Sequence, residues 1–200
     1  MHTPDGATWP GTTDPEHSRW YIARFRAMAA DGHDLAGEAR FVDAMVPRGA
    51  RILDAGCGPG RVGGELHARG HVVVGVDVDP LLIEAAQTDH PGPRWYVSDL
   101  AALDLAALGE DEPFDAAVLA GNVMPFLVRG TASEALRRVG AAVAGDGFVV
   151  VGFQVRRLPL EVFDAAVEGA GLRVEHRFAT WQLGAWHDDA DFAVSVLRHS

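Results

Sequence analysis

Residues 51–61 read RILDAGCGPGR, and this short stretch decides the fold. It begins as an apolar run, typical of a buried strand, and passes into a turn with glycine at positions 56, 58 and 60. Glycine lets the backbone approach a ligand closely because no Cβ stands in the way. Helical spacing follows from Gly60 to Arg69, so the stretch predicts a strand, a glycine turn and a helix around a binding loop.

The rest of the chain alternates in the same way. Apolar, β-branched runs predict strands at 71–77, 94–97, 114–120 and 148–153, and helical spacing predicts helices at 79–89, 132–143 and 160–170. Such a pattern is typical of a parallel sheet covered on both faces. Residues 173–183 and 191–198 have no helix between them, so they are expected to pair antiparallel at one edge. The predicted fold is a doubly wound, Rossmann-like α/β sheet of seven strands with a C-terminal antiparallel hairpin and helices on both faces.

The remaining residues precede this pattern. Residues 1–17 are rich in proline and glycine without apolar periodicity, so they are predicted to form a flexible tail. Residues 18–200 are predicted to form one domain. Within it, two helical stretches in residues 18–46 are expected to form an N-terminal cap over the binding site.

The amino-acid composition disfavours some classes of binding partner and cellular location. The net charge is −11 at pH 7 and every basic residue is arginine, which disfavours general nucleic-acid binding. No apolar run approaches the roughly 20 residues that span a bilayer, so no membrane partner is expected. Cys57 is the only cysteine, and no secretory signal is visible, so a cytoplasmic location is predicted.

The cofactor follows from what surrounds the glycine turn. A dinucleotide fingerprint would need glycine at position 61, where this chain has Arg61, and a Walker loop needs a lysine. Asp54 would repel a pyrophosphate but attract a cation. S-adenosylmethionine (SAM) carries a sulfonium and an ammonium without a phosphate and fits better. Asp77 ends the next strand, where it can accept from ribose hydroxyls. Asp99 can accept from the adenine amine or cap the following segment.

Together these motifs resemble those of the class I SAM-dependent methyltransferases, in a small, single-domain form. Residues 52–61 look like their motif I, 75–79 like motif II, 98–99 like motif III and 114–126 like motif IV. The resemblance implies that Gly56, Asp77 and Asp99 contact SAM, which becomes S-adenosylhomocysteine, and that Gly58 and Gly60 shape the loop. The full set of cofactor-binding residues predicted here is Asp54, Gly56, Cys57, Gly58, Gly60, Asp77, Val78, Ser98, Asp99, Leu100, Ala120, Gly121 and Asn122.

The catalytic base is left open. Methyl transfer from a sulfonium needs an acceptor lone pair at near-attack distance, and a base only where the acceptor carries a proton. The candidates are His17, Tyr21, His33 and His187, and each has a surface position as its alternative. Cys57 is expected to be a small residue of the turn rather than a nucleophile. No metal site is predicted, because the histidines and acids lack close ligand spacing.

The acceptor is expected to be a small molecule. Residues 122–125 do not match the Asn/Asp-Pro-Pro-aromatic signature of enzymes that methylate base amines, and the links near the C-terminus are too short for a substrate domain. The doublets 137–138 and 156–157, with Trp181 and Trp186, can contact an acceptor or simply lie on the surface and pack the hairpin. Two alternative functions remain: a non-catalytic SAM-binding module and an NAD(P)-dependent oxidoreductase.

Overall fold

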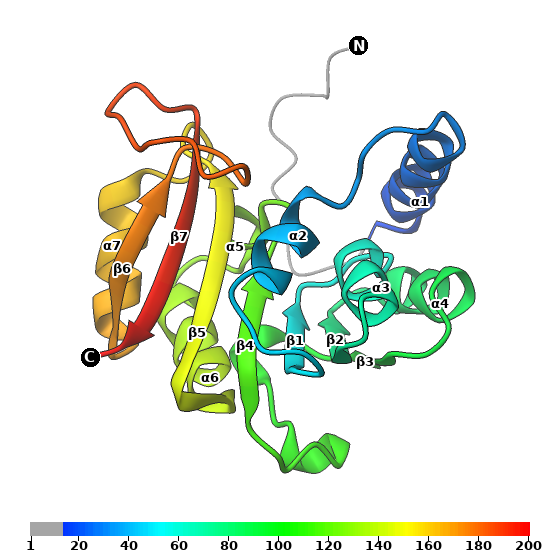
Figure 1. Cartoon of the computed structure of the whole chain (residues 1–200), viewed down its shortest axis with the longest axis horizontal. Coiled ribbons are helices and arrows are strands. Elements are labelled where there is room, and N and C mark those ends of the chain that lie inside the picture. Colours follow the sequence, from blue (N-terminus) through cyan, green and yellow to red (C-terminus); the bar gives the residue numbers. More distant parts are fainter. Residues whose placement is uncertain (1–13) are drawn as a thin grey trace.

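The computed structural model describes residues 14–200, which fold around one seven-stranded sheet (Figure 1). The strand order is β3-β2-β1-β4-β5-β7-β6. The strands are β1 Arg51–Ala55, β2 Val72–Asp77, β3 Arg94–Val97, β4 Phe114–Leu119, β5 Val143–Gln154, β6 Leu172–Phe178 and β7 Phe192–His199. β1 to β5 are parallel, and β7 lies antiparallel between β5 and β6. The predicted fold and terminal hairpin are confirmed.

Helices cover both faces of this sheet. They are α1 Pro15–Ala30, α2 Gly37–Asp43, α3 Arg61–Ala68, α4 Pro80–Asp89, α5 Val123–Phe126, α6 Ala132–Ala142 and α7 Leu160–Gly169, with short 3-10 turns at Leu100–Ala102 and Ala106–Leu108. In Figure 1, α2, α3 and α4 lie in front of the sheet, and α6 and α7 lie behind it. Successive strand residues face opposite sides, so Leu53 joins the α6–α7 core and Ile52 the α2–α3 core. Within residues 14–200, no helix has the length and apolar character to cross a membrane.

Two aspartates cap the starts of α1 and α4, and one of them, Asp79, also joins the two helices. Asp14 accepts from the Glu16 amide at 3.0 Å, and Asp79 accepts from the Leu81 amide at 2.8 Å. A proline follows each cap, which confirms the predicted start of α4 at Asp79 and Pro80. The buried hydroxyl of Ser18 donates to the Asp79 carboxylate. This contact fixes the first turn of α1 beside the end of β2.

The first helix also changes the predicted N-terminal boundary. α1 begins at Pro15, so residues 15–17 of the predicted tail are helical because Asp14 supplies a cap. Residues 1–13 of that tail lie outside the described part of the chain. The second helical stretch was expected over roughly residues 34–46, but α2 covers only residues 37–43.

Two strands differ from the predicted bounds by more than one residue. β5 begins at Val143 rather than Phe148, with a shift of register against β4. The shift needs Gly147, where a Cβ would lie 2.6 Å from the Asp115 carbonyl oxygen. β6 ends at Phe178 rather than continuing to position 183, because residues 179–184 fold into a turn closed by the Ala179 amide on the Gly184 carbonyl at 2.8 Å.

Candidate functional site

The backbone of the predicted glycine turn is left-handed at all three glycines. Gly56, Gly58 and Gly60 have φ values of 80°, 54° and 82°. The amides of Gly56 and Cys57 both donate to the Val76 carbonyl, at 2.8 and 3.0 Å. The turn is therefore held against the end of β2, above the carboxyl ends of the parallel strands, where ligands bind in open α/β sheets.

The three glycines serve different purposes. A Cβ at Gly56 would lie 2.6 Å from a Val123 methyl, and one at Gly60 would lie 2.9 Å from Ala86. Both glycines are therefore required by packing inside the protein. A Cβ at Gly58 would instead point into a cleft, 3.7 Å from Cε1 of Tyr21. Of the three, Gly58 is the one whose missing side chain leaves room beneath Tyr21.

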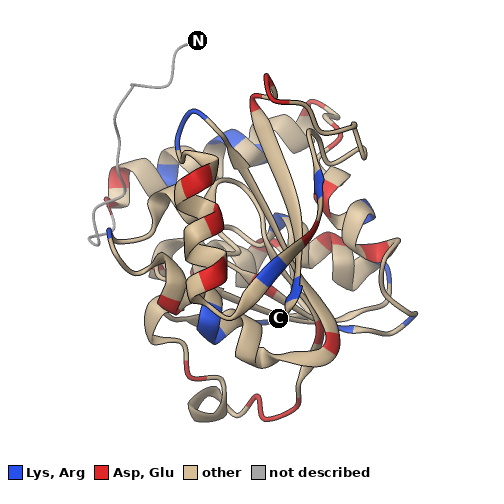
Figure 2. Ribbon diagram, turned by 90° about the vertical axis from the view of Figure 1, so that its left-hand side faces the viewer, with Lys and Arg blue, Asp and Glu red and all other residues tan. Residues whose placement is uncertain are grey.

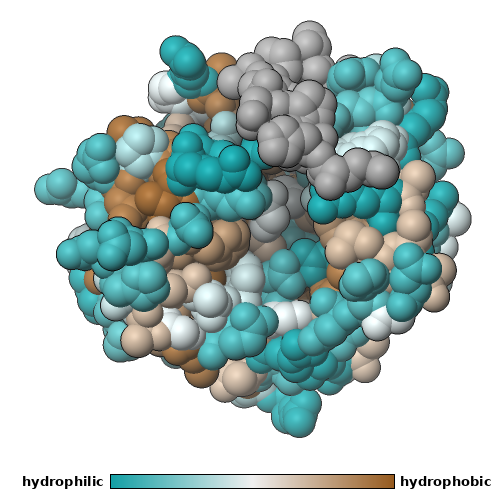
Figure 3. Space-filling model, turned by 90° about the horizontal axis from the view of Figure 1, so that it is seen from above, coloured by the Kyte–Doolittle hydropathy of each residue, from teal (hydrophilic) through white to brown (hydrophobic). Residues whose placement is uncertain are grey.

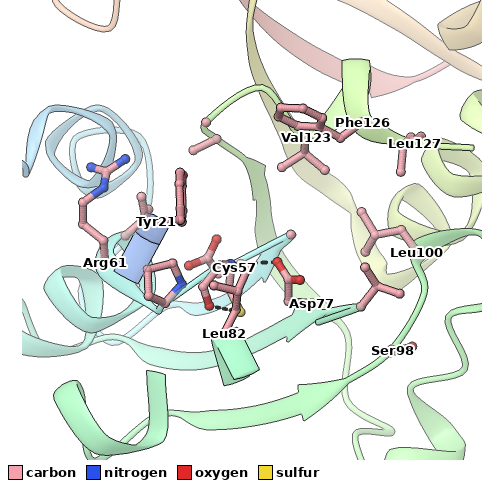
Figure 4. A pocket seen from close by; sticks show the side chains of 18 of the residues that line it. Tyr21, Cys57, Arg61, Asp77, Leu82, Ser98, Leu100, Val123, Phe126 and Leu127 are labelled. Carbon is pink, nitrogen blue, oxygen red and sulfur yellow. Dashed lines mark hydrogen bonds between the residues drawn. The ribbon is translucent and has the colours of Figure 1, made fainter. Parts of the chain in front are cut away.

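That cleft brings together most of the predicted cofactor residues (Figure 4). Its lining includes Asp54, Gly56, Cys57, Gly58, Asp77, Val78, Ser98, Asp99, Leu100, Ala120 and Gly121. Seen from above, the face over which the parallel strands end is hollowed near its centre (Figure 3). Two predicted residues do not line the cleft. Gly60 packs beneath the loop, and the side chain of Asn122 accepts from the Gln154 amide at 2.7 Å, joining the ends of β4 and β5.

Asp77 is held in place by backbone amides. One oxygen of its carboxylate accepts from the Gly58 amide and the other from the Asp79 amide, each at 2.9 Å. Burial raises the pKa of Asp77, although these amides oppose the shift. Each carboxylate oxygen has a second lone pair, so Asp77 retains acceptor capacity toward the cleft.

Asp99 caps the segment that follows it and also lines the cleft. Its carboxylate accepts from the Ala101 amide at 2.9 Å and so caps the 3-10 turn at 100–102. It also lines the cleft next to Ser98 and the buried Leu100. The cap orients the carboxylate, and Leu100 supplies an apolar surface beside it.

Asp54 lies beneath the glycine loop and is 1% exposed. Its carboxylate accepts from the Gly63 amide at 2.8 Å. Burial raises the pKa of Asp54 to about 7, and the Gly63 amide and the Arg61 charge only partly offset this. The group therefore changes charge near neutral pH and can respond to a cationic ligand.

This shift predicts a pH dependence of stability. A carboxyl whose folded pKa is raised binds a proton more tightly when folded, so its contribution to stability is fully present in acid, below the unfolded pKa of about 4, and is lost as pH rises to about 7. Between pH 5 and 8 the wild type should lose about 2–3 kcal/mol relative to Asp54→Asn, whose amide can still accept from Gly63. Urea unfolding of both proteins at both pH values measures this difference. A difference that does not change with pH would contradict a raised Asp54 pKa.

The N-terminal helix closes one side of the cleft. His17, Tyr21 and Phe25 of α1 line it, and the rings of Tyr21 and Phe25 meet edge-on with centroids 4.8 Å apart. A Cβ at Gly121 would lie 3.8 Å from the Tyr21 hydroxyl, so Tyr21 reaches from the glycine loop to the end of β4. Burial raises the pKa of Tyr21. Tyr21 therefore stays protonated at neutral pH and offers a hydrogen-bond donor.

Arg61, at the start of α3, contacts both α1 and α2 and so holds α1 beside the cleft. Its guanidinium pairs with both oxygens of Glu38 on α2, at 2.6 and 2.8 Å, and also donates to the Leu35 carbonyl. The same guanidinium lies over the Phe25 ring, 5.3 Å from its centroid. Of the predicted cap, α1 therefore supplies the lining residues, whereas α2 packs its Phe41 and Val42 into the core and holds Arg61.

The other candidate bases lie elsewhere. His33 is exposed in the turn after α1, and His187 is exposed in the loop between β6 and β7. Neither lines the cleft, whereas His17 and Tyr21 do. Cys57 is buried, which raises the pKa of its thiol, so it is a poor nucleophile.

The sequence reasoning missed an apolar wall opposite α1. Val123 and Phe126 of α5, followed by Leu127 and Val128, line the cleft next to Gly121, and Leu82 of α4 lines its floor (Figure 4). The apolar run at residues 123–128, just after β4, is the feature of the sequence that could have predicted this wall. The short helix α5 begins this run and directs side chains of it toward the cleft. Trp181 is not part of this wall, because it packs against Phe41 and over Gly152.

Comparisons with known proteins agree with this fold. A family model described as a methyltransferase domain matches residues 52–147. A TehB-like SAM-dependent methyltransferase from Corynebacterium glutamicum is 42% identical with a TM-score of 0.88, and the match covers 94% of this chain and 100% of that chain. A sugar N-methyltransferase from a Streptoalloteichus species has a TM-score of 0.69 at 17% identity, covering 100% of this chain and 99% of that one, and shares the fold.

A curated relative is also similar over part of the chain. An uncharacterised methyltransferase from Mycobacterium tuberculosis is 34% identical over 113 residues, which is 55% of this chain and 54% of the relative. The chain thus spans about half the length of the curated relatives it matches.

Proposed function

Because this chain belongs to the SAM-dependent methyltransferases, we propose that it binds SAM in the cleft and transfers the methyl group to a small-molecule acceptor. One observation carries the proposal. The carboxylates of three aspartates at the ends of β1, β2 and β3 (Asp54, Asp77 and Asp99) line one cleft. The backbone of Gly58 and Gly121 lines the same cleft, and the Tyr21 side chain lies near both glycines. Acidic side chains in a cleft repel a pyrophosphate and attract a cation. With glycine backbone that a ligand can approach closely, such a cleft suits an adenosyl ligand with a cationic end better than a dinucleotide.

Each part of the ligand is assigned to different residues that line the cleft. Asp77, with acceptor capacity left on both oxygens, is assigned to the ribose hydroxyls. Asp99 and Leu100 are assigned to the adenine edge and face. Gly58 and Asp54 border the methionyl end, where an ionised Asp54 would favour the ammonium and sulfonium charges.

The reaction is assigned to the end of β4. When bound there, SAM would supply a sulfonium-activated methyl group for displacement by an acceptor lone pair, with S-adenosylhomocysteine as the leaving group. The protein's part is to hold the acceptor against Ala120, Gly121 and Val123 and to exclude water, for which the rings of Tyr21 and Phe126 are placed. Tyr21, as a protonated phenol, is suited to donate a hydrogen bond, and His17 is the remaining candidate base in the cleft.

Isothermal calorimetry with SAM, S-adenosylhomocysteine and NADH tests the proposal. Selective binding of both adenosyl ligands, followed by methyl transfer to members of a small-molecule panel, would support it. Binding without turnover on any acceptor would favour a non-catalytic SAM-binding module. Binding of NADH alone would favour the oxidoreductase. A cytoplasmic location remains a prediction from composition.

Asp77→Ala should weaken S-adenosylhomocysteine binding by about 1.5–3 kcal/mol, the range for hydrogen bonds to a charged group. Asp77→Asn, which can still accept from Gly58, should lose less. Asp111→Ala is the matched control, since it removes an exposed carboxylate that does not line the cleft. Calorimetry on the three folded variants gives the answer. Equal affinity of Asp77→Ala and wild type would remove Asp77 from the ligand site.

A further inference from the structure

The pairing of the arginines is uneven. The protein has a net charge of −11, and most of its arginines lie beside a carboxylate. Arg137 and Arg138, for example, both bind Glu134. Within residues 14–200, the arginines without a carboxylate at ion-pair distance are Arg19, Arg24, Arg129, Arg156 and Arg157. In so acidic a protein, an unpaired guanidinium is available to an external anion.

Arg157 does not itself line the cleft, but it contacts a residue of the apolar wall. Its guanidinium lies over the Phe126 ring, 5.5 Å from the centroid, and Phe126 lines the apolar wall. Its Nε donates to the side-chain oxygen of Gln154 at 2.9 Å. These contacts hold the guanidinium beside the wall residue Phe126 and leave both terminal nitrogens without a partner in the described part of the chain. A planar guanidinium with two free edge donors is suited to an oxyanion.

Two further arginines flank the same wall in the sequence. Arg156 precedes Arg157 on the loop from β5 to α7, and Arg129 follows the cleft residue Val128 in a turn closed by the Thr131 amide on the Val128 carbonyl at 3.0 Å. Both are exposed. Figure 2 shows the loop from β5 to α7, with its basic residues in blue, above α7. The helix α7 itself carries acidic residues along its length, shown in red. The acids of the loop between β6 and β7 are not within ion-pair distance of Arg156 or Arg157.

We propose that the acceptor is an amphipathic organic anion: its apolar body lies on Phe126, Leu127 and Val128, and its carboxylate, sulfate or phosphate group binds Arg157. This inference rests on the proposed function, because it names the substrate class of the same cleft. The wall alone would bind any apolar body. The unpaired arginine over Phe126 adds the requirement for negative charge.

The test uses two fluorescent probes of similar shape and different charge. Anilinonaphthalene sulfonate is an apolar anion, and N-phenylnaphthylamine is its uncharged analogue. Both are titrated in saturating S-adenosylhomocysteine, so that the cofactor end is occupied. Wild type should prefer the anion. Arg157→Gln should weaken the anion about tenfold and leave the neutral probe unchanged. Arg48→Gln is the matched control, because Arg48 is 84% exposed and lies before β1, away from the cleft.

Each outcome of the probe titrations either supports or overturns the inference. Phe126→Ala should weaken both probes, which locates them on the wall. Equal affinity of wild type for the two probes, an unchanged anion affinity in Arg157→Gln, or unchanged affinities in Phe126→Ala would overturn the inference. A loss of both probes in Arg157→Gln would also overturn it, since Arg157 would then only support the Phe126 ring. If S-adenosylhomocysteine itself fails to bind, the proposed function falls, and the same probe titrations without it still decide the anion site.

Discussion

Gly58→Val is expected to abolish measurable cofactor binding, weakening S-adenosylhomocysteine by at least about a hundredfold, or roughly 2.7 kcal/mol. The residue has φ of 54°, and its Cβ would enter the cleft 3.7 Å from the Tyr21 ring. A valine there fills the space that the backbone cradle leaves open. It also strains the loop, because left-handed φ costs a residue with a Cβ about 1–2 kcal/mol.

A second glycine separates these two effects. Gly49 has φ of 74°, but a Cβ there would meet nothing within 4 Å. Gly49→Val therefore carries the same kind of backbone strain without blocking the cleft. Calorimetry with S-adenosylhomocysteine and urea unfolding on both variants compare binding with stability. Retained binding in Gly58→Val, or an equal loss in Gly49→Val, would exclude steric blocking of the cleft.

Trp95→Ala is expected to cost about 3–5 kcal/mol of unfolding free energy, the usual cost of truncating a buried aromatic. Trp95 is 6% exposed and lies beneath the glycine loop. Its ring would clash with a Cβ at Gly63, at 2.8 Å, or at Gly75, at 2.2 Å. Its indole nitrogen donates to the His90 carbonyl at 3.0 Å. Because Gly60 also rests on this ring, cofactor binding should weaken together with stability.

The matched substitution is Trp20→Ala, which truncates a tryptophan that is 45% exposed on α1. This variant should remain within about 0.5 kcal/mol of wild type, as surface substitutions usually do. Urea unfolding followed by circular dichroism measures both variants. A loss below about 1 kcal/mol in Trp95→Ala would mean that the loop is not supported from beneath.

The cover of the cleft depends on partners that are distant in the sequence. Ser18 joins α1 to the start of α4, and Arg61 joins the glycine loop to Glu38 on α2 and to Phe25 on α1. Arg61, which argued against a dinucleotide fingerprint, therefore has a positive role. It connects the start of α3 to the two N-terminal helices beside the cleft.

Some properties follow from the sequence alone. Parallel strands could be predicted because buried strands and amphipathic helices have different apolar periods, and these are visible locally. The glycine turn and the carboxylates Asp54, Asp77 and Asp99 could be placed together because parallel strands end at one edge of a sheet. The cap at Asp79 was likewise local, since it depends on one side chain and the proline that follows.

Other properties were decided only by the tertiary structure. The pKa of Asp54 near 7 comes from burial beneath the loop, which no residue spacing reveals. Gly56 and Gly60 look like Gly58 in the sequence, but packing against Val123 and Ala86 gives them a different role. The position of His17 and Tyr21 in the cleft depends on contacts between distant segments, as does that of Arg157 over Phe126. The physical reason is that periodicity fixes which face of an element is buried, whereas the partner on that face is set by how the elements pack.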